Sequence, residues 1–337
     1  GFGYFLTNLY WVTISLTHDT NFNFLIPIAL ILIPSFLAIF YALISLLFFM
    51  FNPKNILSGF FLFSLLFGII EFIRGTILTG FPWNLIIYSF SDNPSFLSIL
   101  AVIGTYSLNL LIISIFTLPT LFILRKSKKE IIVCVLFLLL PILFLSYGNI
   151  QKKNFSKKII IENSYTIRVI GSNISLERFY NDYSPEGVIE ELIEISSPEK
   201  DKKIFFIWPE GIIPNTFQDE LHLYKDIIIK YFNKNHLISL GITTREKKAN
   251  DYVFYNSFSV FDNNLNLISN YDKIKLVPFG EFLPFEKIFK KVGLKTITNN
   301  IGSFTKGNQR KIVNVQENND QFKFLPLICY EIIYSGH

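Results

Sequence analysis

Length, composition and charge together exclude an ordinary soluble domain. The chain has 337 residues, half of them hydrophobic and 37 of them phenylalanine, and its mean hydropathy is +0.40, which is well above the usual range for soluble domains. The modest net charge of +5, without a basic block interleaved with aromatic residues, gives no reason to expect nucleic-acid binding, and two cysteines are too few for a disulfide framework.

Charged residues divide the chain into two parts. Only ten of them lie in residues 1–150, a stretch made mostly of long apolar runs, and all the others lie in residues 151–337. We therefore predict a lipid-embedded helical domain over residues 1–150 and a water-facing domain over residues 151–337.

Long apolar runs in the first part predict membrane-spanning helices. About 20 apolar residues in a helix cover the hydrocarbon core of a bilayer, and five runs are candidates. The predicted spans are residues 1–18, Phe24–Phe51, Ile56–Ile73, Phe96–Leu124 and Ile131–Tyr147. The chain begins with Gly1-Phe2-Gly3-Tyr4-Phe5 and no methionine, so we expect further sequence before it.

Positive charge predicts the orientation of these spans. Five basic residues occur at the short connections on one side: Lys54, Arg125, Lys126, Lys128 and Lys129. The other side carries Asp19, Asp92 and only Arg74. By the positive-inside rule the first side is cytoplasmic, which places the second domain outside the cytoplasm. Four lysines beyond the fifth span oppose this orientation, but charges that lead into a large domain count for less.

Residues from about 159 onward alternate between strand-like and helix-like segments. The predicted strands are Tyr165–Gly171, Ile204–Trp208, Leu237–Ile242, Asn256–Phe261, Leu265–Tyr271 and Phe322–Cys329, and the predicted helices are Pro185–Ile195 and Glu220–Phe232. This alternation is typical of a layered α/β domain. In such sheets reactive groups gather beyond the carboxyl ends of strands.

Cys329 is the candidate nucleophile. It follows the apolar run Leu325-Pro326-Leu327-Ile328, which predicts a buried strand with the thiol at its tip. A thiol attacks a carbonyl as the thiolate, so it needs a base, and the resulting oxyanion needs a cation or N–H donors. Glu210 could move the proton and Lys273 could supply the charge. A cysteine–histidine pair is the less favoured alternative, because no histidine lies in these motifs.

Three motifs in this order carry a family resemblance: Trp208-Pro209-Glu210, then Lys273 with Leu276-Val277-Pro278-Phe279-Gly280-Glu281, then Ile328-Cys329-Tyr330-Glu331. They resemble the nitrilase superfamily with its Glu-Lys-Cys triad. Together with the membrane spans, and with Glu71-Phe72-Ile73-Arg74-Gly75, Thr79-Gly80-Phe81-Pro82-Trp83 and Tyr255-Asn256-Ser257, the chain is similar to the apolipoprotein N-acyltransferase family. This resemblance implies an α-helical transmembrane bundle followed by an α/β nitrilase-like domain, an α-β-β-α sandwich.

The resemblance also implies the reaction and its residues. Glu210 would be the general base, Lys273 would stabilise the oxyanion, and Cys329 would take an acyl chain from a phospholipid as a thioester. The chain would then pass to the α-amino group of the N-terminal diacylglyceryl cysteine of an apolipoprotein. Glu281 would be a further essential carboxylate, and Tyr330 and Glu331 would support the nucleophile.

The same resemblance implies that the protein needs no metal or cofactor. It would act as a monomer in the bacterial inner membrane, as a multi-pass protein with its catalytic domain on the periplasmic side. Family members continue through further strands and a final membrane helix, so we expect sequence beyond His337.

Five residues are further candidates for substrate binding: Tyr180, Asn256, Trp83, Glu71 and Arg74. Tyr180 stands where the family usually has a tryptophan. Glu71 and Arg74 share one helix face, where they could form a snorkelling ion pair or line a lipid entrance. Trp83 could anchor the chain at the membrane interface or form a wall of the site.

The segment Phe285–Val292 has one apolar face and a lysine-rich opposite face. It predicts a helix that lies on an anionic lipid surface, or a packed surface helix.

Two other functions remain open. A membrane-tethered amidase or nitrilase would share the triad, although a small polar substrate needs no lipid-embedded domain. An inactive membrane scaffold would be expected to lack a triad residue, and all three are present.

Overall fold

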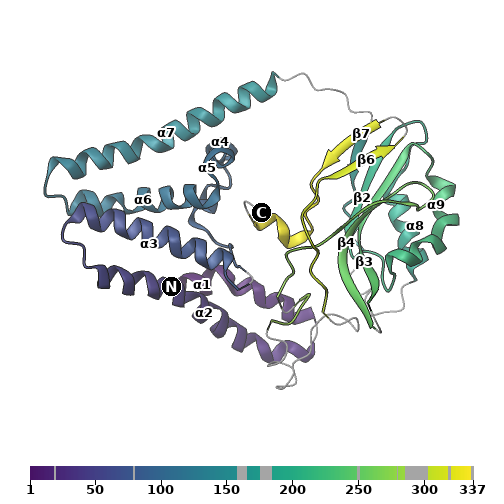
Figure 1. The fold of residues 1–337 in the computed structure, drawn as a ribbon, viewed down its shortest axis with the longest axis horizontal. Coiled ribbons are helices and arrows are strands. Elements are labelled where there is room, and N and C mark those ends of the chain that lie inside the picture. The colour runs from purple at the N-terminus through teal and green to yellow at the C-terminus, as the bar shows by residue number, and fades with distance from the viewer. Residues whose placement is uncertain are drawn as a thin grey trace. The chain divides into compact units, whose positions relative to one another are not determined.

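The computed structural model describes residues 1–18, 20–78, 80–157, 165–174, 184–248, 251–278, 280–284, 303–317 and 320–334. It forms two compact units, which we call the helical unit (Gly1–Ile159) and the sheet unit (Ile160–Ser335) (Figure 1).

Among the described residues of the helical unit, four helices are long and apolar enough to cross a membrane. They are α2 (Ile26–Phe51), α3 (Ile56–Thr76), α6 (Thr105–Ile123) and α7 (Lys128–Ser156). In this unit α2 packs against α3, α3 against α6, and α6 against α7. Only 17% of the most apolar stretch of α2, and of α7, is buried, so the outer faces of both helices require a lipid environment.

Polar side chains set the starts of two of these helices. The Asn55 side chain accepts a hydrogen bond from the backbone N–H of Ser58 at 2.7 Å and caps α3. Ser127 and Glu130 form a capping box at the start of α7. Each cap satisfies backbone donors that the first helical turn leaves unpaired.

Two predicted spans are not single α-helices. Residues 1–18 form the eight-residue helix α1 (Phe2–Leu9) and a 3₁₀ helix (Tyr10–His18), with a second 3₁₀ helix at Thr20–Leu25. The predicted span Phe96–Leu124 is interrupted at Gly104, whose φ is +77°. The short helices α4 (Pro94–Leu97) and α5 (Leu100–Ile103) precede this glycine, and a 3₁₀ helix occupies Ile86–Phe90. Apolar composition alone gave no sign of the break, which glycine permits because it lacks a Cβ.

The sheet unit is built on a mixed five-stranded sheet. Its strands are β1 (Thr166–Val169), β2 (Ile204–Glu210), β3 (His236–Lys248), β4 (Asp251–Phe261) and β5 (Leu267–Asp272), paired in that order. The β1–β2 and β2–β3 pairs are parallel, and the β3–β4 and β4–β5 pairs are antiparallel. The predicted layered α/β domain is therefore confirmed.

Successive side chains of β2 point to opposite faces of this sheet. Phe206 packs into a core beneath α8 (Pro185–Ser196) and α9 (Lys225–Tyr231), whereas Phe205 packs on the other face against Phe322 and Phe324. These two phenylalanines belong to a hairpin of β6 (Val313–Glu317) and β7 (Asp320–Phe324). Helices thus cover one face of the sheet and the hairpin covers the other (Figure 1).

The final predicted strand, Phe322–Cys329, is shorter than expected. Strand β7 ends at Phe324, the chain then runs without regular structure to Ile328, and Cys329 begins a 3₁₀ helix that ends at Ile333. Pro326 has no N–H to donate to a neighbouring strand, and β7 pairs only with β6 among the described strands. The predicted helix Glu220–Phe232 likewise divides into a 3₁₀ helix (Gln218–Tyr224) and α9.

Buried His236 should make the stability of the sheet unit depend on pH. Asn233 N–H donates to its Nδ1 at 3.2 Å, and its Nε2 lies 3.0 Å from the carbonyl oxygen of Glu199, which suits a neutral ring protonated at Nε2. Burial, and then the charge of Arg168, lower the pKa of His236. The contribution of neutral His236 to the stability of the sheet unit is complete above about pH 6.5, the pKa of histidine in the unfolded chain. It is lost as the pH falls toward the pKa of His236 in the folded protein, which is lower.

We expect the thermal unfolding temperature to fall from pH 8 to pH 5, and His236→Gln to flatten that fall. Exposed His222 supplies the matched control, because His222→Gln should leave the slope unchanged. Equal slopes in wild type and His236→Gln would refute the assignment.

Candidate active site

The direction of the strands brings the predicted glutamate and lysine to one edge of the sheet. Glu210 is the last residue of β2, and Lys273 directly follows β5. Because two successive antiparallel pairings separate β5 from β3, β5 runs in the same direction as β3 and β2. Asn256 of β4 lies beside this edge, where its carbonyl oxygen accepts the N–H of Lys273 at 2.8 Å.

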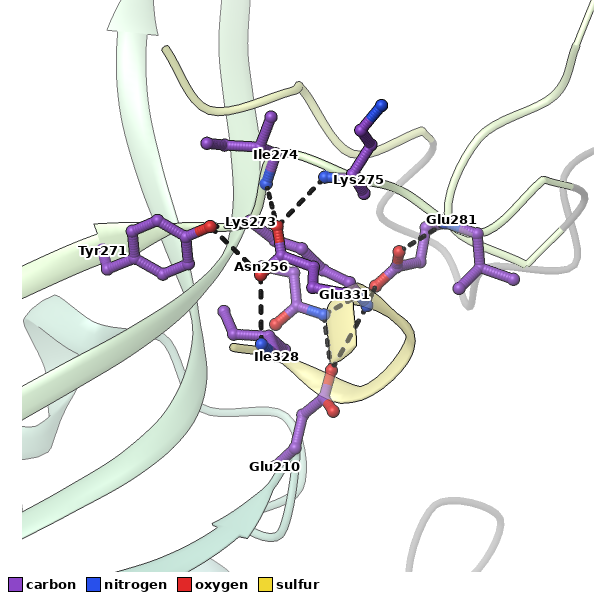
Figure 2. Close-up of polar contacts among 10 residues, drawn as sticks. Glu210, Asn256, Tyr271, Lys273, Ile274, Lys275, Glu281, Ile328 and Glu331 are labelled. Carbon is purple, nitrogen blue, oxygen red and sulfur yellow. Dashed lines mark hydrogen bonds and ion pairs between the residues drawn. The ribbon is translucent and has the colours of Figure 1, made fainter. Parts of the chain in front are cut away.

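A buried ammonium and two carboxylates form the centre of the site (Figure 2). Lys273 is 1% exposed; its Nζ donates to Glu281 Oε1 at 2.9 Å and lies 3.9 Å from Glu210 Oε1. Asn256 Nδ2 donates to Glu210 Oε1 at 2.7 Å and to Glu281 Oε1 at 2.6 Å. A buried ammonium needs a paired carboxylate to offset its desolvation, and Glu281 meets that need.

Glu281 is held by its own turn. Its Oε2 accepts the N–H of Val277 at 2.8 Å, and its N–H donates to the carbonyl oxygen of Val277, also at 2.8 Å. The carbonyl oxygen of Glu281 accepts the N–H of Phe304 at 2.7 Å. The carboxylate is therefore fixed by backbone contacts as well as by Lys273.

Cys329 has a strained backbone and a thiol that stays protonated at neutral pH. Its φ is +47°, a region that costs a residue with a Cβ about 1 kcal/mol or more and is enriched at functional sites. Partial burial raises the pKa of Cys329, the negative charge of Glu210 raises it further, and Lys273 lowers it. Because an ordinary cysteine pKa already lies above 8, this thiol requires a base before it can attack.

Glu331 ties the lysine segment to the cysteine segment. It is fully buried, and its Oε1 accepts the N–H groups of Ile274 and Lys275 at 2.9 and 3.1 Å. Its Oε2 accepts the N–H of Ile328 at 3.0 Å, and the Tyr271 hydroxyl donates to both oxygens at 2.9 and 3.1 Å. Burial and the Glu331 charge raise the pKa of Tyr271, so its hydroxyl remains a donor.

Aromatic contacts surround the residues next to this centre. Tyr330 packs edge-on against Tyr334 with ring centroids 5.2 Å apart, and Lys275 Nζ lies 4.9 Å from the Tyr334 ring. Lys275 therefore points away from the Glu281 contact that Lys273 makes, as alternation along an extended segment predicts.

Glu71, Arg74 and Trp83 form a separate cluster in the helical unit. Arg74 donates to Glu71 through Nε at 3.2 Å and Nη2 at 2.5 Å, and both side chains are fully buried. Arg74 Nη1 also donates to the carbonyl oxygens of Phe81 and Trp83, at 2.6 and 3.0 Å. The geometry favours a buried clamp on the loop that follows α3 over a snorkelling pair. Substrate binding by these residues stays a prediction.

Comparison with known proteins shows which proteins the chain is similar to. Residues 1–118 match the model of the apolipoprotein N-acyltransferase N-terminal domain, and residues 204–336 match that of carbon-nitrogen hydrolases. Apolipoprotein N-acyltransferases of Brucella melitensis biotype 1 and Brucella suis biovar 1 are each 30% identical over 99% of this chain and 63% of the relative. That of Rhodopseudomonas palustris is 29% identical with the same coverage.

The chain is therefore similar to apolipoprotein N-acyltransferases along its whole length. It spans 63% of the length of these relatives. These matches confirm the predicted resemblance and the predicted fold class, because apolar helices precede a region that matches carbon-nitrogen hydrolases and contains a mixed sheet.

Some predictions fall outside the described residues. These are Tyr180, the segment Phe285–Val292 and His337. Two contributors to the site were not predicted. Tyr271 could have been suspected, because it lies two residues before Lys273 and so on the same face of an extended strand. Nothing in the sequence distinguishes Gly241, which pairs with Glu210 across the β2–β3 ladder.

Gly241→Ala should displace Glu210. A Cβ at this position would lie 2.7 Å from the Cα of Glu210 and 2.9 Å from its Cγ, so Glu210 would have to move. We expect kcat of acyl transfer to fall about 10- to 100-fold, because an error of about 1 Å in a catalytic group can cost 100-fold.

Gly187→Ala in α8 is the matched control, because its Cβ would meet only the Ser184 hydroxyl oxygen at 3.4 Å. Unchanged turnover in folded Gly241→Ala protein would show that the close approach has no catalytic role.

Proposed function

We propose that this chain carries the acyl-transfer site of an apolipoprotein N-acyltransferase. Cys329 takes a fatty acyl chain from a phospholipid and passes it to the α-amino group of the N-terminal diacylglyceryl cysteine of an apolipoprotein. The observation that supports this proposal most is the convergence of Glu210, Lys273 and Glu281 at one edge of the sheet, together with the influence of Glu210 and Lys273 on the Cys329 thiol.

The first half of the reaction moves the acyl chain to the enzyme. Glu210 accepts the proton of the Cys329 thiol while the sulfur attacks the ester carbonyl carbon of the phospholipid. A C–S bond forms, and the resulting oxyanion is stabilised by the charge of Lys273. The ester C–O bond then breaks, the leaving oxygen takes the proton from Glu210, and a lysophospholipid departs from the thioester.

The second half moves the acyl chain to the acceptor. The neutral α-amine attacks the thioester carbonyl carbon and gives a proton to Glu210. A C–N bond forms, the C–S bond breaks, and Glu210 returns the proton to the Cys329 sulfur. Glu210 thus acts as base and then as acid in each half, which leaves the enzyme unchanged after one turnover.

The two carboxylates have different tasks in this proposal. Glu281 lies 2.9 Å from Lys273 Nζ and compensates the buried charge, whereas Glu210 lies 3.9 Å away and is 36% exposed. Glu210 is therefore the carboxylate that remains available for proton transfer. Glu331 positions the nucleophile, because its backbone contacts join the segment after Lys273 to the residue before Cys329.

The reaction is proposed to take place outside the cytoplasm, at the surface of the bacterial inner membrane. The connections between α2 and α3 and between α6 and α7 carry Lys54, Arg125 and Lys126, and Lys128 and Lys129 begin α7. With that side cytoplasmic, α7 delivers the chain to the periplasmic side. The acyl donor would then be the surrounding lipid.

A transfer assay tests the proposal. Full-length protein is incubated with phospholipid vesicles carrying a labelled acyl chain and with a peptide that begins with diacylglyceryl cysteine. We expect labelled amide on the peptide and release of lysophospholipid, and neither product with Cys329→Ala. Release of ammonia from small amides without acyl transfer would instead favour a membrane-tethered amidase. No turnover of any substrate would favour a scaffold.

A further inference from the structure

Asn256 contacts both carboxylates at the centre of the site and the backbone of Lys273. Its Nδ2 donates to Oε1 of Glu210 and to Oε1 of Glu281, and its backbone carbonyl oxygen accepts the N–H of Lys273. Figure 2 shows its amide between the two carboxylates and next to the lysine. A primary amide has two N–H bonds, and these two carboxylates use both.

Because both of its side-chain N–H groups are engaged, Asn256 does not have the role of a substrate-binding residue. A side chain whose donors are already engaged has no N–H to offer to a lipid or peptide. Two carboxylates on one nitrogen also repel each other, and one ammonium offsets only one of their charges. The two N–H donors of Asn256 offset part of this repulsion, because each of them donates to one carboxylate.

We propose that Asn256 is a positioning residue that holds Glu210 and Glu281 together as carboxylates, and that it occupies Oε1 of Glu210 so that Oε2 accepts the Cys329 proton. The inference rests on the proposed function, because it assigns the base its reactive oxygen. Strand β4 provides the rigid support, since Asn256 is paired with Thr243 of β3 in the middle of a long antiparallel ladder.

The charged and titratable groups at the site come from four segments. They are Glu210 at the end of β2, Lys273 after β5, Glu281 in the following turn, and Cys329 at the start of the last 3₁₀ helix. Removal of the amide donor takes hydrogen bonds away from both carboxylates and so favours their protonated forms. As the pH is lowered, turnover of the variant should then begin to fall at a higher pH than turnover of the wild type.

Two variants test this inference through the pH dependence of lysophospholipid release. With Asn256→Leu we expect the acid limb of kcat/KM to move to higher pH by about one unit, because a hydrogen bond to the charged form of a carboxylate is lost. With Asn256→Asp, which has nearly the same shape, we expect a larger displacement, because a third carboxylate is added. In both variants kcat should fall while KM for phospholipid changes little.

Controls separate this role from simpler ones. Asn314→Leu changes another strand asparagine, whose side chain accepts a hydrogen bond from Gln321, and should leave the acid limb in place. A raised KM with an unmoved limb would mean substrate binding. A loss of turnover that is uniform with pH would mean a structural role. Either result would overturn the inference.

The variant Glu210→Gln shows whether a negative result contradicts the inference about Asn256 or the proposed function on which that inference rests. If this variant keeps wild-type turnover, Glu210 is not the base and the proposed function fails. If it abolishes turnover while both Asn256 variants keep the wild-type acid limb, only the inference about Asn256 fails. Asn256→Asp keeps the test valid if Asn256→Leu does not fold.

Discussion

Glu331→Gln should abolish acyl transfer and destabilise the sheet unit. The variant replaces one carboxylate oxygen by an NH₂ group that faces backbone N–H and tyrosine O–H donors, so at least one buried donor loses its acceptor. We expect the free energy of unfolding to fall by about 2–4 kcal/mol, and kcat to fall at least about 100-fold as Cys329 moves relative to Lys273. Denaturant unfolding and lysophospholipid release measure the two effects.

A graded series checks the physical reason for that effect. Tyr271→Phe removes only the hydroxyl donor to Glu331 and should cost about 1–2 kcal/mol, with a smaller loss of turnover. Glu190→Gln changes an exposed glutamate of α8 and should change neither quantity. If Glu331→Gln behaved like Glu190→Gln, the carboxylate would not join the segment after Lys273 to the segment before Cys329.

Arg74→Met should strongly destabilise the helical unit. It leaves Glu71 buried without its partner and leaves the carbonyl oxygens of Phe81 and Trp83 without their arginine donor. Removal of one partner of a buried ion pair costs about 3–5 kcal/mol. We expect a lower unfolding temperature in detergent, together with faster proteolysis of the loop after α3.

The double variant Glu71→Leu/Arg74→Met separates the ion pair from the loop contacts. Without an uncompensated charge it should be more stable than Arg74→Met alone, because a buried pair replaced by apolar residues is often neutral. Its loop should still be cleaved faster than in wild type. A double variant less stable than Arg74→Met would contradict the buried-pair interpretation.

The layered domain could be predicted because continuous apolar runs such as Ile204–Trp208 of β2, which alternate with helix-like segments, are local information. Both Glu210 and Lys273 were predicted at strand ends, and the structure brings them to one edge of the sheet because β2 and β5 run in the same direction. The break at Gly104 was invisible, since the flanking residues are apolar on both sides. Whether such a run forms one helix or several depends on the packing around it.

The part of the site that could not be predicted depends on contacts between segments that are far apart in the sequence. Glu331 was expected to support its neighbour Cys329, but its bonds to Tyr271, Ile274 and Lys275 span more than 50 residues of sequence. The strand predicted up to Cys329 is also wrong in its last five residues. The apolar residues there predicted a buried strand, but Pro326 has no backbone N–H to donate to a neighbouring strand.

The most direct test of the account is the mass of the peptide that contains Cys329. After incubation of the full-length protein with phospholipid alone, without an acceptor, we expect that peptide to gain one fatty acyl group that hydroxylamine removes. Glu210→Gln should slow its appearance, and added diacylglyceryl-cysteine peptide should discharge it. If lipoprotein acylation proceeded while Cys329 never carried an acyl group, the proposed transfer through this thiol would be contradicted.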